Sequence, residues 1–137
     1  MSFSRQQTFP GTRDSVRAAR NFIGDSLGGW GVADRRDDMR LCVSELAANV
    51  VTHGVPEGRR FAVRVEWVRD LVRIEVRDSG PGVPVVRCAS PDALSGRGLW
   101  LVSQLADGLT VEDGSVGKTV SAVFRVRGEG LPASIDY

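Results

Sequence analysis

Two apolar runs in this chain are separated by only two residues. Residues 60–68 (RFAVRVEWV) and 71–76 (LVRIEV) alternate or run apolar with β-branched side chains, as half-buried strands do. The two residues between them, Arg69 and Asp70, suffice for a tight hairpin turn, whereas parallel strands need a connection of a dozen or more. The sequence therefore predicts an antiparallel hairpin at its centre.

Helical and strand-like segments are grouped around this hairpin. We expect a short strand over 5–9, a helix N-capped by Thr12 that reaches Leu27 and stops at Gly28-Gly29, and a helix opened by Asp34 that continues to His53 and ends at Gly54. An irregular loop over 83–95, a helix over 97–106 and a second hairpin (109–112 and 119–126, around Asp113-Gly114) follow. This order predicts an α+β fold, a two-layer α/β sandwich whose mixed, mostly antiparallel sheet is covered by helices on one face. Doubly wound nucleotide-binding folds need strictly alternating strands and helices, which this order lacks.

The composition is that of a soluble globular protein with one domain. The chain has 137 residues, 42% hydrophobic and 26% charged, with a net charge of +1, so nothing suggests direct nucleic-acid binding. We expect a single domain over 1–137, with its core at about 8–127 and a flexible tail over 128–137. No signal peptide or membrane span is evident, and two cysteines without a pairing pattern suit a cytoplasmic protein.

One glycine-rich segment imitates a phosphate-binding loop. GSVGKT (114–119) ends like a P-loop, but Glu112 stands where that motif needs its first glycine. The segment also lies between two predicted strands, whereas a P-loop opens a helix. We therefore expect Lys118 and Thr119 to be hairpin residues.

The second predicted helix carries a polar stripe beside its apolar face. Glu45, Asn49 and His53 are four residues apart, and Thr52 lies near them. The core arc is Met39, Cys42, Val43, Leu46 and Val50, while Arg36, Arg40 and Ser44 are expected to be solvated on the opposite side. The stripe has two interpretations: an ordinary polar helix surface, or an Asn49 amide oxygen for Mg²⁺ with Glu45 placed one turn away to accept a proton.

Two glycine-bearing segments also have two interpretations each. VRDSGPGVP (76–84) reads as a turn or as the wall of a pocket, and LSGRGLWLV (94–102) as a capped loop or as a helix N-terminus that binds phosphate.

The four patterns occur in one order: E-x-x-x-N on a helix, D-x-G-x-G after a strand, G-x-G-L opening a helix, and G-x-T before the last strand. In this order the chain resembles the Bergerat-fold (GHKL) ATPases shared by gyrase, Hsp90, histidine kinases and MutL. It is most similar to the small anti-sigma-factor serine/threonine kinases of Gram-positive bacteria, especially actinobacteria. The resemblance runs from about Thr8 to Arg127 and is most specific in SELAANVVTHG.

The resemblance implies a role for each matching residue. Glu45 would be the catalytic base and Asn49 the Mg²⁺ ligand, while Asp78 would accept a hydrogen bond from the adenine amino group. The remaining residues implied to bind ATP are Gly80 and Gly82 at the adenine, Gly96, Arg97, Gly98 and Leu99 at the phosphates, and Thr119 in support of Asp78. The chain departs from the family pattern at Val50, where alanine is common, and in its short loop between the glycine boxes.

The resemblance also implies a function. It indicates an ATP-dependent serine/threonine protein kinase that acts as an anti-sigma factor, binding a sigma factor and phosphorylating a small anti-anti-sigma protein, and it suggests a homodimer. The alternative is a non-catalytic ATP-binding module that sequesters a regulator. Arg13, Arg17 and Arg20 lie at helical spacing and form either a docking face or an ordinary solvated surface.

Overall fold

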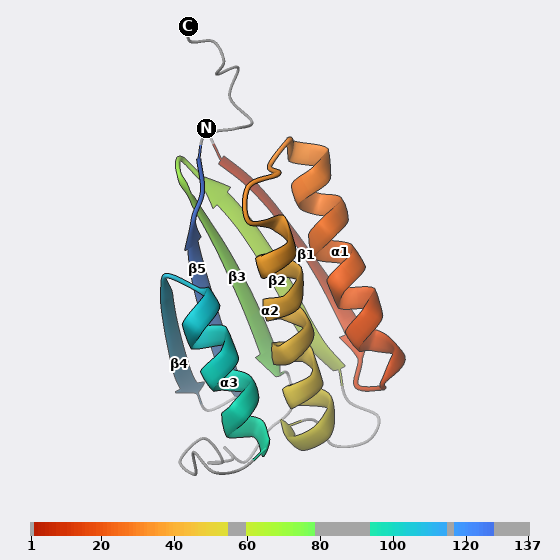
Figure 1. The fold of residues 1–137 in the computed structure, drawn as a ribbon. Coiled ribbons are helices and arrows are strands. Elements are labelled where there is room, and N and C mark those ends of the chain that lie inside the picture. The colour runs from red at the N-terminus through yellow and green to blue at the C-terminus, as the bar shows by residue number, and fades with distance from the viewer. Residues whose placement is uncertain (1, 55–59, 79–93, 115–116, 128–137) are drawn as a thin grey trace, which may run out of the picture.

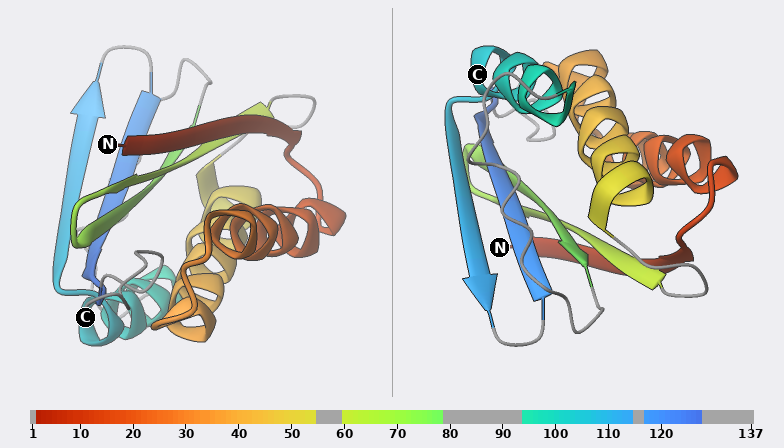
Figure 2. Two further views of the ribbon diagram at one scale, coloured as in Figure 1. Left: turned by 90° about the horizontal axis from the view of Figure 1, so that it is seen from above. Right: turned by 90° about the horizontal axis from the view of Figure 1, so that it is seen from below.

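A computed structural model describes residues 2–54, 60–78, 94–114 and 117–127 of the chain; at 53–54, 94–97, 113–114 and 117 it describes the backbone alone. The fold has two layers, with three helices covering one face of a five-stranded sheet (Figures 1 and 2). The helices are α1 (Asp14–Trp30), α2 (Arg36–Asn49) and α3 (Leu94–Leu105), and a π-helical turn, η1 (Val50–Gly54), extends α2. The strands are β1 (Ser2–Pro10), β2 (Arg60–Val68), β3 (Leu71–Asp78), β4 (Gly108–Gly114) and β5 (Gly117–Arg125).

The sheet confirms the predicted fold class. Its strand order is β1-β2-β3-β5-β4, and all four pairings among the described residues are antiparallel, so the described sheet is not mixed. The β2–β3 hairpin forms with Val68 opposite Leu71, and Arg69 takes a left-handed conformation (φ 58°) in the turn.

The core lies between the helices and the inner face of the sheet. Strand positions alternate between this core and solvent, because successive side chains point to opposite faces. On β3 the inward residues are Val72, Ile74, Val76 and Asp78; on β5 they include Val120, Ala122 and Phe124. The outer face carries charged residues such as Arg64, Glu66 and Glu75, which form surface ion pairs.

Both N-terminal helix boundaries differ from the prediction. The first helix starts at Asp14 without a side-chain cap, so Thr12 does not cap it. It ends at Trp30, followed by Gly31 in a left-handed conformation (φ 83°), rather than at Gly28-Gly29. The second helix begins at Arg36. The Asp34 carboxylate does not open it but accepts a hydrogen bond of 2.9 Å from the backbone N–H of Arg127.

The polar side of α2 is not solvated as expected, because it packs against α1. Ser44 is buried, and Arg20 donates a hydrogen bond of 3.5 Å to its hydroxyl. A methyl group on Gly24 would lie 3.2 Å from the Arg40 side chain. Gly24 and Gly28 of α1 thus leave room for the close approach of the Arg40 and Arg36 side chains of α2.

Candidate nucleotide site

The predicted site elements converge at one end of the molecule. The end of α2, the start of α3, the end of β3 and the start of β5 all lie at the lower end of the view in Figure 1. Helix α2 occupies the middle of the helical layer and contacts both α1 and α3. Residues far apart in sequence are therefore brought to one region.

Glu45 and Gly98 are in close proximity. A methyl group on the Gly98 Cα would lie 3.1 Å from Glu45 Oε1, tighter than an ordinary contact. The Glu45 carboxylate, which is half-buried, therefore faces the first turns of α3 across the α2–α3 contact. Only glycine at position 98 leaves this approach unobstructed.

Asn49 lies one turn after Glu45, at the last residue of α2, and is half-buried. The helix then widens into η1, and π turns of this kind occur frequently at functional sites. The backbone of His53 belongs to η1, and Thr52 is exposed.

Cys42 stands one turn before Glu45 on the core side of the helix. Burial, followed by the nearby charge of Glu45, raises the pKa of the Cys42 thiol to about 12. The thiolate is the reactive form of cysteine, so Cys42 is a packing residue and not a nucleophile.

Asp78 is the one charged residue in the buried set of the described chain, at 6% exposure. It is the last residue of β3, opposite Phe61, and shares the inner face with Val76. A carboxylate in such a position must be hydrogen-bonded or paired. Its burial distinguishes Asp78 from a solvent-exposed turn residue.

The structure does not bring Thr119 to Asp78. Thr119 is opposite Arg77 on β3 and Glu112 on β4, both exposed, and its own neighbour Val120 is buried. Since side chains alternate along a strand, Thr119 points to the outer face and Asp78 to the inner face. The prediction that the Thr119 side chain supports Asp78 is therefore wrong, because the strand register sets the two side chains on opposite faces of the sheet.

The other predicted residues are described only in part. Gly80, Gly82 and most of the predicted loop lie outside the described residues, as does the tail over 128–137. Gly96 and Arg97 belong to α3, which begins at Leu94, three residues before the prediction. Leu99 is half-buried and packs against the core.

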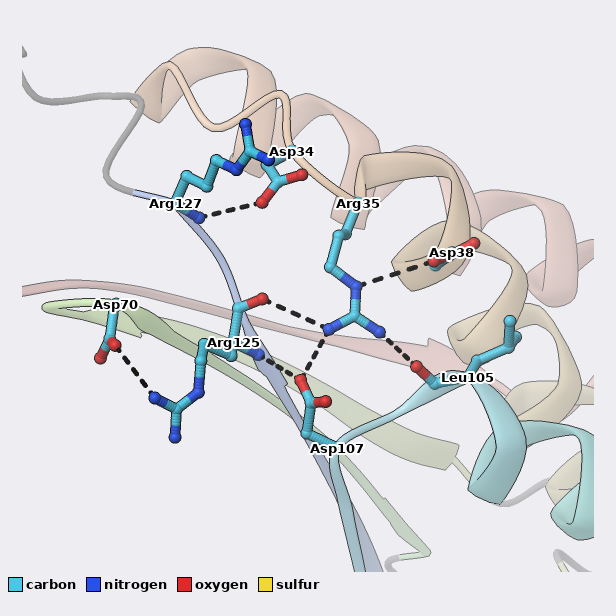
Figure 3. Close-up of polar contacts among 8 residues, drawn as sticks. All are labelled: Asp34, Arg35, Asp38, Asp70, Leu105, Asp107, Arg125 and Arg127. Atoms are coloured by element: carbon cyan, nitrogen blue, oxygen red, sulfur yellow. Dashed lines mark hydrogen bonds and ion pairs between the residues drawn. The ribbon is translucent and has the colours of Figure 1, made fainter. Parts of the chain in front are cut away.

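A polar network at the other end of α3 was not foreseen from the sequence. Arg35, in a left-handed conformation (φ 61°), donates hydrogen bonds to the carbonyl of Leu105 at the end of α3 and, at 2.6 Å, to Asp107 Oδ2 (Figure 3). The Arg125 backbone N–H also donates to Asp107 Oδ2, at 2.6 Å. The Arg125 and Arg35 hydrogen bonds lower the pKa of Asp107. Arg35 thereby ties the start of α2 to the end of α3.

A scan against family models matches residues 9–124 to the histidine kinase-like ATPase domain. The chain belongs to this family. Membership places it among the GHKL-type ATPases, as the motif order indicated, and a domain of this family binds ATP. A search of curated proteins found no matching relative.

Solved structures share the histidine kinase-like ATPase fold. One is the crystal structure of the RsbU and RsbW domains of Rv1364c from Mycobacterium tuberculosis, with a TM-score of 0.67 and 20% identity over 90% of this chain. This chain spans 32% of that protein's length. The Acinetobacter baumannii histidine kinase AdeS (TM-score 0.53, 12% identity, 90% of this chain and 68% of that one) is a second.

A third match is the histidine kinase domain of the blue-light activated kinase EL346 from Erythrobacter litoralis. It has a TM-score of 0.55 and 19% identity over 94% of this chain and 67% of that one. No helix in the described ranges is long and apolar enough to cross a membrane.

The donor set bears on which metal this ATPase domain could hold. Within the described residues, no three His, Cys, Asp or Glu side chains gather as a metal site. Mg²⁺ does not need such a cage, because it keeps waters and takes nucleotide phosphates as ligands. The amide oxygen of Asn49, a half-buried residue one turn after Glu45 on α2, is a ligand of the kind that such coordination needs.

Proposed function

We propose that this protein is an ATP-dependent serine/threonine protein kinase that acts as an anti-sigma factor. It would phosphorylate a small anti-anti-sigma protein and bind a sigma factor. The observation that carries the proposal is the Glu45 carboxylate facing α3 beside Gly98. This arrangement sets a proton acceptor next to the helix start where the γ-phosphate is expected.

Each residue has a defined task in this proposal. Asp78 accepts a hydrogen bond from the adenine amino group, as an ionised carboxylate can only accept. Backbone N–H groups at the glycine-bearing start of α3 bind phosphate, because a helix N-terminus favours anions. Asn49 would hold Mg²⁺ together with the phosphates, and the ion would supply positive charge against the phosphate oxygens.

The proton and the phosphoryl group move in one balanced step. The serine or threonine oxygen bonds to the γ-phosphorus while its proton passes to Glu45, and the bond between the γ-phosphorus and the β–γ bridging oxygen breaks to release ADP. A positioned general base contributes about 10²- to 10⁴-fold to such a rate.

The proposed protein substrate, an anti-anti-sigma protein, is inferred from similarity to other proteins. The motif run SELAANVVTHG resembles the anti-sigma kinases, and one solved structure of the same fold contains an RsbW domain. The homodimer and the cytoplasmic location belong to the same proposal. Intact Glu45 favours a kinase over the non-catalytic sequestering module.

The deciding experiment is a phosphoryl-transfer assay with Mg²⁺ and γ-labelled ATP. Its acceptor is a purified anti-anti-sigma protein encoded in the same genome. Wild type should label a serine or threonine on the acceptor, and Glu45→Gln should lower transfer at least 100-fold while binding ATP normally. Asp78→Asn should weaken ATP binding itself, because the uncharged amide oxygen still accepts a hydrogen bond but less strongly than a carboxylate.

Binding can be followed by the fluorescence of Trp100, which is 61% exposed on α3 two residues after Gly98. ATP binding without transfer to any acceptor would replace the kinase by the sequestering module. Equal transfer by Glu45→Gln would refute the role of Glu45. Light scattering of the purified protein tests the homodimer.

A further inference from the structure

The register of β3 and β5 places an unexpected residue across from Asp78. The pairs run from Leu71 and Arg125 to Arg77 and Thr119. The pairing ends there, but β3 continues to Asp78 and β5 begins at Gly117, so extending the same register by one residue sets the position of Lys118 opposite that of Asp78. Lys118 is the only lysine in the chain.

The two side chains belong to the same face of the sheet. Lys118 has the same parity on β5 as buried Val120 and Ala122, and Asp78 has the same parity on β3 as buried Val76. Residues directly opposite in an antiparallel pair have Cβ atoms about 4.5–5.5 Å apart. The position of Lys118, which is itself half-buried, thus shares the inner face of the sheet with the position of the buried Asp78.

We propose that Lys118 is a positioning residue that sets the selectivity of the site for adenine through Asp78. This inference rests on the proposed role of Asp78. The ammonium group has donors and no acceptor, so beside it the Asp78 carboxylate is held as an acceptor for the adenine amino group. A 6-oxo purine presents an acceptor at that position and is rejected.

Lys118 also pairs through its backbone with the strand on its other side. Its partner on β4 is Asp113, so Lys118 lies between two aspartate positions of the adjacent strands. Thr119, the next residue, is directed to the opposite face of the sheet. It therefore offers a control substitution at the same point of the same strand.

The test compares the affinities for ATP and for inosine triphosphate, which carries a 6-oxo group in place of the amino group. Trp100 fluorescence reports both in wild type, Lys118→Met, Lys118→Arg and Thr119→Val. We expect Lys118→Met to lower the preference for ATP about tenfold, the scale of one charge-assisted hydrogen bond. Lys118→Arg should keep most of the preference, and Thr119→Val all of it.

A double substitution tests whether Lys118 acts through Asp78. In the Asp78→Asn background, Lys118→Met should change the remaining preference little, because neighbouring residues that act together are not additive. An unchanged preference in Lys118→Met, or an equal loss for both nucleotides, would overturn the inference. Thermal melting of each variant separates these results from unfolding.

The outcome also separates this inference from the proposed function. If wild type bound neither nucleotide, the assigned nucleotide site would fail together with the inference. If wild type transferred phosphate and preferred ATP, but Lys118→Met kept that preference, only the role of Lys118 would fail.

Discussion

Gly98→Ala should separate an effect on catalysis from an effect on stability. The added methyl group would lie 3.1 Å from Glu45 Oε1, so the carboxylate must retreat by a few tenths of an ångström. Alanine favours a helix interior over glycine by about 0.8–1 kcal/mol. Moving the Glu45 side chain off its preferred rotamer costs about 0.5–1.5 kcal/mol. The net change in the free energy of unfolding should therefore be close to zero.

Gly29→Ala is the matched control for this substitution. Gly29 also lies in a helix, and a methyl group there would meet nothing within 4 Å. It should stabilise the protein by about 0.5–1 kcal/mol, since only the helix preference acts. Urea unfolding of the two variants should thus differ by about 1 kcal/mol or somewhat less.

Catalysis should respond to Gly98→Ala alone. Displacing a catalytic group lowers a rate steeply, about 100-fold for a shift of 1 Å, so we expect about a tenfold loss of phosphoryl transfer. Gly29→Ala should transfer phosphate at the wild-type rate. In a Glu45→Gln background, Gly98→Ala should have no further effect. If Gly98→Ala matched Gly29→Ala in both stability and transfer, the close approach of Glu45 to α3 would be refuted.

Three further predictions concern the polar network and the buried thiol. Arg35→Ala should destabilise the protein by about 2 kcal/mol, because it leaves the Leu105 carbonyl without its charged donor. Arg35→Gly should recover about 1 kcal/mol of this loss, because glycine adopts the left-handed backbone conformation without strain. Urea unfolding measures both changes in the free energy of unfolding. The pKa of Asp107 lies below its ordinary 3.8, so the stability that the ionised carboxylate contributes is present above about pH 4 and is lost as the pH falls through the lowered pKa. Asp107→Asn should therefore lose less stability than wild type when both are unfolded by acid. An acid-unfolding curve that the substitution leaves unchanged would contradict this. The buried thiol can be tested in a Cys88→Ser variant, in which Cys42 is the one remaining cysteine. Because the pKa of Cys42 is about 12, it should resist iodoacetamide at pH 8 in the folded protein and react once urea unfolds the protein. Rapid labelling of the folded protein would contradict the burial of Cys42.

The sequence predicted the sheet well where local pattern decides it. The strand over 60–68 and its two-residue turn were confirmed, because alternation and turn length act over a few residues. The prediction that the arginines on α2 are solvated was wrong, because the sequence of one helix does not indicate that α1 packs over them. The predicted helix boundaries were wrong by two or three residues for the same reason. Asp34, for example, accepts a hydrogen bond from the backbone of Arg127, 93 residues away, and does not open the helix.

The candidate site was predictable as a set of residues but not as a geometry. Spacing on one helix sufficed to single out Glu45 and Asn49. It could not state which face of β5 Thr119 would occupy, because a shift of one residue in register reverses every side chain. Lys118 was read as a hairpin residue, and its relation to Asp78 depends on a pairing between strands that are about 40 residues apart.

The strand order also determines how the chain can fold. The β2–β3 and β4–β5 hairpins join neighbouring segments, but β1 pairs with β2 across about fifty intervening residues and β3 pairs with β5 only after α3 and β4 have been made. Closing long loops costs entropy before any contact compensates it, and chains rich in such contacts fold slowly. We therefore expect the two hairpins to form early and the outer strand β1 to join afterwards. During synthesis, β1 and the first two helices leave the ribosome before the strands with which they pack. The candidate nucleotide site is completed only when β5 has emerged.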